Sequence, residues 1–165
     1  MLVSTRTEYS KAQIILHWLV AILILVAWLT GDNMGRVLRA RFDSGTTGFE
    51  GSTPHVWLGC AVFVLILVRL VLRRIQGAPG ALPGSTEMME KAALWGHRVI
   101  YLLMIAVPAL GALAWFGGVR AAGEAHETAS NALLLVALGH AVVAIWHHVI
   151  RKDGALDRMR LSQKG

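Results

Sequence analysis

The sequence predicts an all-α membrane protein built as a bundle of four transmembrane helices. Of its 165 residues, 55% are hydrophobic and 16% are charged, and the mean hydropathy is +0.55, which is too apolar for an ordinary soluble domain. Because backbone polar groups find no water in the bilayer core, long apolar runs predict helices and not open sheets. Four runs approach or reach the ~17 to 25 residues that a span needs: Ile14–Thr30, Val56–Leu72, Val99–Phe116 and Ala129–Ile150.

One domain over residues 1–165 is expected, and no internal repeat is found. The first span lacks a small-residue cleavage site after it, so it is expected to be retained rather than removed as a signal peptide. The segments 31–53 and 73–90 are expected to be connectors. The spans are expected at about 12–31, 54–73, 92–116 and 126–150.

Local signals support the first two helix starts. Ser10 followed by Gln13 fits a capping box, and Thr53 followed by Pro54 fits a cap with a first-turn proline. In the third span Pro108 cannot donate a backbone hydrogen bond, which predicts a bend.

The distribution of positive charge predicts that both termini face the cytoplasm (N-in/C-in). All but four of the 16 Lys and Arg residues then lie inside, which obeys the positive-inside rule. The net charge of +6 is explained by loops that face anionic lipid, so no nucleic-acid partner is expected. The basic residues that lie outside are Arg36, Arg39, Arg41 and Arg120.

Histidines are the candidate functional residues, and their depths in the membrane separate them. His55 opens the second span and His126 opens the fourth, so both lie near the outer face. Two imidazoles at matching depth on different helices are what a haem iron with two axial ligands requires. Cys60 is the only cysteine, which excludes a covalently attached c-type haem, so any haem would be held by histidine.

A second pair lies towards the inner face, where His17 has either His140 or His147 as its partner. By helical rise His17 is ~9 Å, His140 ~16 Å and His147 ~6 Å from the nearest basic anchor, so depth allows both partners. His140 is favoured, because a second haem must fit above the inner interface and leave His147 free to meet solvent or substrate. On the last helix His126, His140 and His147 share one face, with the first two ~21 Å apart along the axis.

Three further side chains at this depth are less specific. Arg69 shares the face of His55 at the depth of the inner pair, where it could neutralise a haem propionate or simply extend to the membrane interface. His97 and His148 are interpreted as solvated or hydrogen-bonded interface side chains.

Five segments that together cover nearly the whole chain carry a family resemblance: YSKAQIILHW at 9–18, HVWLGCAVFVLILVRLVLR at 55–73, GHRVIYLLMIAVPALG at 96–111, HETASN at 126–131 and GHAVVAIWHHVIRKDGALDRM at 139–159. They resemble the bacterial cytochrome b561 family. The resemblance implies four helices, two b-type haems and electron passage between a quinone and another donor or acceptor. It implies His17 and His140 as ligands of an inner haem, His55 and His126 as ligands of an outer haem, and His147 beside the quinone.

One branch of this family oxidises superoxide to dioxygen and passes the electron to ubiquinone, so the resemblance implies superoxide:ubiquinone oxidoreductase as an activity. The sequence departs from that branch in a short loop at 117–125, in Ala125 where a tryptophan is common, and in Gly84 where a lysine is expected near the quinone. The outer basic residues could steer an anion, but acidic residues oppose them: Asp32, Asp43, Glu50, Glu124 and Glu127.

The expected function is therefore di-haem electron transfer in the bacterial inner membrane by a multi-pass protein, with ubiquinone as acceptor and His147 handling a proton. A second interpretation is a cytochrome b subunit that links a dehydrogenase or a periplasmic redox partner to quinone. A third, of another class, is a haem-free transporter that uses the same histidines for protons or divalent ions.

Overall fold

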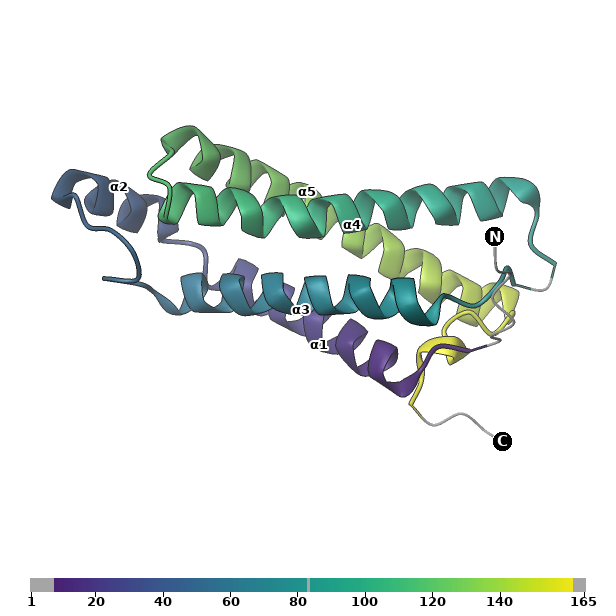
Figure 1. Ribbon diagram of the computed structural model, residues 1–165. Coiled ribbons are helices and arrows are strands. Elements are labelled where there is room, and N and C mark those ends of the chain that lie inside the picture. The colour runs from purple at the N-terminus through teal and green to yellow at the C-terminus, as the bar shows by residue number, and fades with distance from the viewer. Residues whose placement is uncertain (1–7, 83, 162–165) are drawn as a thin grey trace.

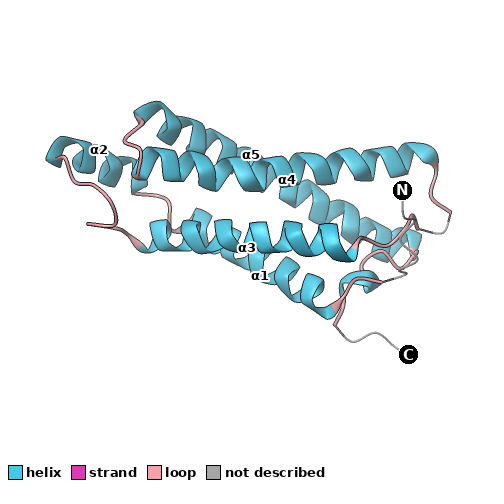
Figure 2. Ribbon diagram, in the orientation of Figure 1, coloured by secondary structure: helices cyan, strands magenta, loops and turns pink. Residues whose placement is uncertain are grey.

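The computed structural model describes residues 8–82 and 84–161. Within these residues the chain is helical and has no strands (Figure 2). Four of its helices are long and apolar enough to cross a membrane, which confirms the predicted all-α class. The elements are α1 (Lys11–Leu29), α2 (Met34–Ser44), α3 (Pro54–Gln76), α4 (Glu87–Trp115), α5 (Arg120–Trp146), the π-helical turn η1 (His147–Arg151) and the short 3-10 helix η2 (Asp157–Met159).

The four long helices form a bundle with two different ends (Figure 1). α1 packs along α3, α4 packs along α5, and α3 contacts α4. One end carries α2 and the α4–α5 turn, and we call it the α2 end. The other carries the α3–α4 loop and both ends of the described chain, and we call it the terminal end. All four long helices contribute to the buried core, which contains Val20, Val62, Ile66, Met104 and Leu133.

Most apolar side chains of the spans face away from the bundle. Only 6% to 17% of the most apolar stretch of each span is buried inside the protein, as expected for helices solvated by lipid. Exposed tryptophans stand near both ends of the spans, a distribution typical of membrane–water interfaces. They are Trp28 and Trp57 at the α2 end, and Trp18, Trp95 and Trp146 at the terminal end.

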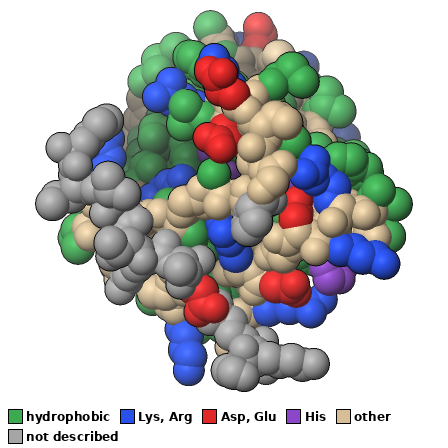
Figure 3. Space-filling view, turned by 90° about the vertical axis from the view of Figure 1, so that its right-hand side faces the viewer, with side chains coloured by type: hydrophobic (Ala, Val, Ile, Leu, Met, Phe, Trp, Pro, Cys, Tyr) green, Lys and Arg blue, Asp and Glu red, His purple; other side chains and the backbone are tan. Residues whose placement is uncertain are grey.

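The terminal end carries much of the positive charge. Figure 3 looks onto this end, where Lys and Arg side chains gather together with Asp and Glu. Two residues counted among the inner charges, Arg6 and Lys164, lie outside the described residues.

The start of α1 is capped as predicted and is tied to the end of α3. In the capping box, Ser10 Oγ accepts the Gln13 N–H and the Ser10 N–H donates to Gln13 Oε1, each at 3.2 Å. Gln13 Nε2 also donates to the Gly77 carbonyl at 3.0 Å, and Ser10 Oγ donates to Gln76 Oε1 at 2.6 Å. These bonds hold α1 and α3 together at the terminal end.

The last two long helices begin earlier than the expected spans 92–116 and 126–150. α4 starts directly after Thr86, whose hydroxyl accepts a backbone hydrogen bond from the first turn. α5 takes in part of the segment 117–125, which was expected to be a loop. α4 also continues through Pro108 without interruption.

The segment 31–53 is not a plain connector, because it contains α2. This helix has only 11 residues and no long apolar run. A prediction based on long apolar runs therefore misses it. Arg41, which is only 6% exposed, joins α2 to its surroundings by donating to the carbonyls of Gly48 at 2.7 Å, Glu50 at 2.6 Å and Trp115 at 3.3 Å. Arg41 is therefore a structural link and not a free outer charge.

Beyond η1, the residues 152–161, which we call the C-terminal segment, fold back over the terminal end. Trp18 Nε1 of α1 donates to the Met159 carbonyl at 3.0 Å. Arg158 donates to the carbonyls of Gly80 at 2.7 Å and Ala81 at 3.4 Å in the α3–α4 loop. The segment therefore lies against both α1 and that loop.

Candidate functional site

At the α2 end, the rings of His55 on α3 and His126 on α5 lie with their centroids 5.9 Å apart. His55 Nδ1 donates to the Ala27 carbonyl of α1, and His126 Nδ1 donates to the Val107 carbonyl of α4, both at 2.8 Å. A carbonyl can only accept, so Nδ1 carries a proton in both rings, and in the neutral form of each ring Nε2 keeps its lone pair. That tautomer is the one a metal-binding histidine uses when its second nitrogen is held by the protein.

Gly111 makes room for the His126 ring against α4. A Cβ added at Gly111 would lie 3.0 Å from His126 Nδ1 and 3.1 Å from Cε1, closer than ordinary van der Waals contact. Gly111 lies one helical turn after Val107, whose carbonyl binds the same ring. The hydrogen bond and the glycine therefore together set the position of His126.

At the terminal end, His17 on α1 and His140 on α5 lie with ring centroids 6.5 Å apart. The ring of His97 on α4 lies 5.3 Å from that of His140, and its Nδ1 donates to the Ala93 carbonyl of its own helix at 2.6 Å. Three imidazoles therefore meet at this end. His97 had been interpreted as an interface side chain, although its position near the start of the third span already gave it the right depth.

The ring spacings fit one metal ion between each pair. Metal–nitrogen bonds of about 2 Å on opposite sides of an ion place two imidazole centroids ~6 Å apart. The pairs at 5.9 and 6.5 Å match this spacing, and each joins helices from different parts of the sequence. Within the described residues, no cluster of three or more His, Cys, Asp or Glu side chains could hold a bare metal ion. Each pair therefore has the spacing of two imidazoles that share one metal ion.

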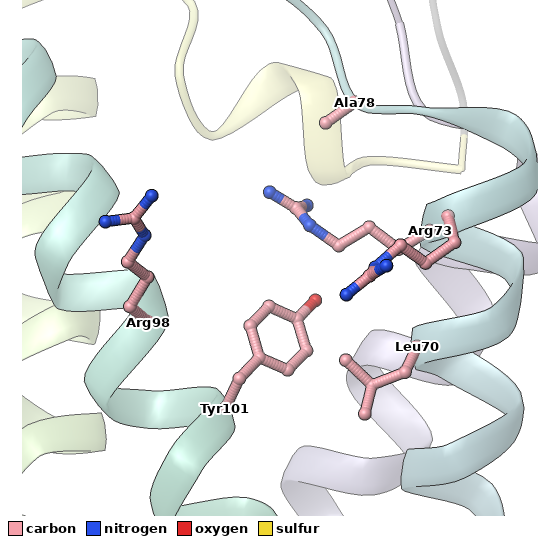
Figure 4. Close-up of a pocket in the computed structure, with 6 residues that line it drawn as sticks. Leu70, Arg73, Ala78, Arg98 and Tyr101 are labelled. Atoms are coloured by element: carbon pink, nitrogen blue, oxygen red, sulfur yellow. The ribbon is translucent and has the colours of Figure 1, made fainter.

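Two arginines of α3 lie near the imidazoles of the terminal end, Arg69 near His17 and His140 and Arg73 near His97. Arg69 donates to the Gln13 carbonyl at 3.4 Å and lies 6.0 Å from the Tyr101 ring, and Arg73 lies 5.5 Å from the same ring. A cavity of about 460 Å³ opens beside them between α3 and α4 (Figure 4). This end can therefore receive a carboxylate or phosphate group. The cavity is lined by Leu70, Arg73, Arg74, Ala78, Arg98 and Tyr101.

His147 begins the π-helical turn and binds a residue that sequence reasoning missed. His147 Nδ1 and Asp153 Oδ2 are 2.6 Å apart, and both side chains are mostly buried, at 14% and 8% exposure. Burial raises the pKa of Asp153, but hydrogen bonds from His147 and the Ala155 N–H, together with the charges of His147 and Arg151, outweigh it. The pKa of this carboxyl therefore lies below its usual range. No helical periodicity connects residues 147 and 153, so no sequence pattern pointed to this contact.

Arg151 connects the same carboxylate to the α3–α4 loop. Its Nε lies 3.3 Å from Asp153 Oδ2, its Nη2 donates to the Gly84 carbonyl at 3.2 Å, and its Nη1 contacts Met89 Sδ at 3.2 Å. Gly84 is the position where the resemblance led us to expect a lysine. A guanidinium from another part of the chain therefore lies against the backbone at that position.

Comparisons with known proteins identify the family of this chain. The family model for prokaryotic cytochrome b561 matches residues 8–161. Cytochrome b562 of Cereibacter sphaeroides is 40% identical over 153 residues, covering 92% of this chain and 94% of the relative. The probable superoxide oxidase CybB of Yersinia pestis is 29% identical, covering 96% and 98%. Cytochrome b561 homolog 1 of Escherichia coli is 28% identical, covering 95% and 99%.

Four spanning helices, paired histidines and a match over nearly the whole chain lead to the same conclusion. The resemblance found in the sequence is therefore confirmed, and the family cofactor is haem b. The chain belongs to the prokaryotic cytochrome b561 family, and it is a bacterial multi-pass membrane protein of electron transport.

Proposed function

We propose that the protein holds two haem b groups and passes electrons between the α2 end and a quinone at the terminal end. The observation that carries this proposal is the presence of two imidazole pairs, one at each end, with ring centroids 5.9 and 6.5 Å apart. His55 and His126 bind one haem iron, and His17 and His140 bind the other. When bound, each haem supplies one-electron redox chemistry without an open coordination position.

His140, rather than His147 or His97, is the second ligand at the terminal end. The spacing of His17 and His140 suits one iron between them, and they come from helices on different sides of the bundle. His147 has its Nδ1 bound to Asp153 in the turn after α5, and His97 lies only 5.3 Å from His140 on the helix packed along α5. His97 is therefore a neighbour of this haem and not its ligand.

The arginines beside the terminal-end pair hold the haem propionates. Arg69 and Arg73 both face the Tyr101 ring next to the cavity between α3 and α4. A guanidinium binds a carboxylate through two parallel hydrogen bonds, which suits a propionate at the edge of the bundle. These residues orient the macrocycle and balance its negative charge.

The terminal end faces the cytoplasm in this proposal. Arg69, Arg73, Arg74, Arg151 and Lys152 all belong to this end, and the positive-inside rule places such residues in the cytoplasm. Both termini are then cytoplasmic, and the α2 end faces the outside. Quinone chemistry takes place at the inner interface, where His147 can exchange a proton with water.

Haem stoichiometry and quinone reduction test the proposal. The pyridine haemochrome of purified protein should give two haems per chain, and a value of one would mean that only one pair binds. Pre-reduced protein mixed with ubiquinone-1 should be reoxidised quickly, as followed at the haem α-band. Reoxidation that is no faster than without quinone would exclude quinone as the acceptor.

The electron donor has two candidates, and different observations favour them. The name of the Yersinia pestis relative favours superoxide. The charges at the α2 end do not favour it, because the cavity of about 370 Å³ that reaches His55 is lined by Asp32 and by no arginine. In addition Arg41 is buried and Arg120 pairs with Asp43 at 3.6 Å. These charges suit a docked dehydrogenase or periplasmic redox protein better than a steered anion.

Pulse-generated superoxide separates the two donors. If superoxide is the substrate, the pulse should reduce the haems of the oxidised protein at once. If the haems stay oxidised, the docked-donor interpretation stands. The haem-free transporter considered from the sequence is set aside, because the family binds haem b.

A further inference from the structure

We propose that Asp153 is a positioning residue that fixes the tautomer of His147 for proton transfer to the quinone, and that Arg151 holds the Asp153 carboxylate in place. This inference rests on the proposed quinone function and assigns the groups that serve it. It goes beyond His147 itself, which the sequence had already selected.

The backbone brings Asp153 back to His147 by a local departure from the α-helix. α5 ends at Trp146, and residues 147–151 form a π-helical turn, a feature that is frequent at functional sites. Lys152 follows in the left-handed region with φ of 53°, a conformation that a lysine adopts only at a conformational cost. This reversal places residue 153 against residue 147, which a continuing α-helix would not do.

The Asp153 carboxylate is held from three sides. Oδ2 accepts from His147 Nδ1 at 2.6 Å and lies 3.3 Å from Arg151 Nε, while Oδ1 accepts the Ala155 N–H at 3.2 Å. Arg151 is itself anchored by its bond to the Gly84 carbonyl. The carboxylate therefore has little freedom to turn away from the imidazole.

This contact determines which nitrogen of His147 can react. A carboxylate bound at Nδ1 fixes the proton there, so Nε2 is the nitrogen that exchanges protons. Reduction of a quinone to a quinol consumes two electrons and two protons, and it converts both carbonyls to hydroxyls. In our proposal the two electrons come from the haems, Nε2–H of protonated His147 gives one proton to one quinone oxygen, and a proton from the aqueous phase reaches the other oxygen. A further proton from the aqueous phase then restores the imidazolium of His147. Before the His147 imidazolium gives up its proton, the Asp153 carboxylate stabilises its positive charge.

Other contacts already hold the C-terminal segment in place. Trp18 binds the Met159 carbonyl, and Arg158 binds the carbonyls of Gly80 and Ala81. The segment therefore does not depend on the His147–Asp153 bond alone for its attachment. Attachment of the C-terminal segment therefore does not by itself explain why the buried Asp153 carboxylate lies against His147. Orientation of the His147 ring for proton transfer does.

The first experiment measures steady-state reduction of ubiquinone-1 by holoprotein with an excess of a small-molecule reductant. Asp153→Asn should lower kcat by about 10- to 100-fold, the size of effect seen when the hydrogen-bond partner that orients a functional histidine is lost, with KM little changed. Asp153→Glu keeps the carboxylate and should recover much of the rate. The matched control is Asp157→Asn, because Asp157 is an exposed aspartate of the same segment that pairs with Arg160 at 3.1 Å. It should behave as wild type.

A double variant separates a proton-transfer role from a structural one. In the His147→Gln background, Asp153→Asn should cause no further loss of rate, because the two residues act as one unit. An additional loss in that background, loss of haem, or a rise in KM alone would show that Asp153 only maintains the fold. Equal rates for Asp153→Asn and wild type would also overturn the inference.

A readout independent of quinone keeps this inference distinct from the proposed function. Nitrogen-15 NMR of histidine-labelled holoprotein, with His147→Gln used for assignment, should give the Nδ1–H tautomer for His147 and a mixture of tautomers in Asp153→Asn. A wild-type protein that fails to reduce quinone but has this tautomer would overturn the proposed function alone. An unchanged tautomer in Asp153→Asn would overturn the inference alone.

Discussion

At the α2 end the two imidazoles are fixed by backbone carbonyls of neighbouring helices, whereas at the terminal end charged side chains and a third imidazole surround the pair. His55 and His126 each donate Nδ1–H to a carbonyl at 2.8 Å. Among the described residues, neither His17 nor His140 has such a bond, but Arg69 and Arg73 lie nearby. One pair is oriented by helix backbone, and the other lies in a positive electrostatic environment.

This difference predicts the direction of electron flow. A hydrogen bond from Nδ1 makes a histidine a stronger donor to iron, which favours the oxidised metal, and nearby positive charge favours the reduced metal. The haem at the α2 end should therefore have the lower reduction potential and the haem at the terminal end the higher one. Electrons would then run from the α2 end towards the quinone.

The largest expected effect is the loss of one haem at one end. His126→Leu should remove the haem at the α2 end, and His140→Leu should remove the haem at the terminal end, so the pyridine haemochrome should fall from two haems per chain to one in each variant. His147→Ala should keep both haems. Loss of a haem with His147→Ala, and not with His140→Leu, would mean that His147 is the ligand.

A smaller effect should follow from filling the space beside His126. In Gly111→Ala the new Cβ would lie 3.0 Å from His126 Nδ1 and would displace the ring. We expect lower haem content and an altered electron paramagnetic resonance signal for the α2-end haem alone. The control is Gly35→Ala in α2, where a Cβ would meet nothing within 4 Å. A normal spectrum for Gly111→Ala would mean that the α4 backbone moves to make room for the new methyl group. The His126 ring would then not be held rigidly at the α2 end.

The charge difference between the ends can be measured by redox titration. Arg69→Gln removes one positive charge near the terminal-end pair and should lower the higher of the two potentials, on the order of 50 mV for a charge at this range in a protein interior. The lower potential should change much less. Arg39→Gln in α2 gives a charge-matched control far from the terminal end. An equal shift of both potentials by Arg69→Gln would contradict the assignment of the charge to one haem.

The smallest expected effect is a pH dependence confined to the terminal end. Because the pKa of Asp153 lies below its usual range, the folded carboxylate contributes stability that is complete above about pH 4, the usual Asp pKa, and is lost as the pH falls through the lowered value. Hydrogen exchange of the C-terminal segment, expressed relative to the intrinsic amide exchange rate at each pH, should therefore be insensitive to this group between pH 7 and 5, and should rise at lower pH. Asp153→Asn should remove that rise. A similar rise at α2 would indicate general acid unfolding.

Sequence reasoning succeeded best where a single helix carries the information. The four spans followed from apolar length, and the start of α1 followed from the pattern of Ser10 and Gln13. Depth along the helices grouped His55 with His126 but left both His140 and His147 as partners of His17, and only the room needed by a second macrocycle favoured His140; the rings of both favoured pairs do lie together. That they bind haem iron is still a prediction.

Other features could not be read from any periodic pattern. α2 is too short and polar for the hydropathy criterion, and the burial of Arg41 depends on carbonyls from two other segments. His97 had the right depth, but only the packing of α4 along α5 brings it to His140. The contact between His147 and Asp153 depends on a π-helical turn and a left-handed lysine.

The sequence by itself determined the four candidate membrane spans and the position of each histidine along its helix. Both properties depend on distance along one helix, which apolar length and residue spacing set directly. The tertiary structure decided which carbonyl each imidazole meets, which glycine makes room for it, and which carboxylate binds His147. Those contacts depend on how each helix is rotated about its axis and on where the chain leaves the helix, and these are set by packing between distant segments.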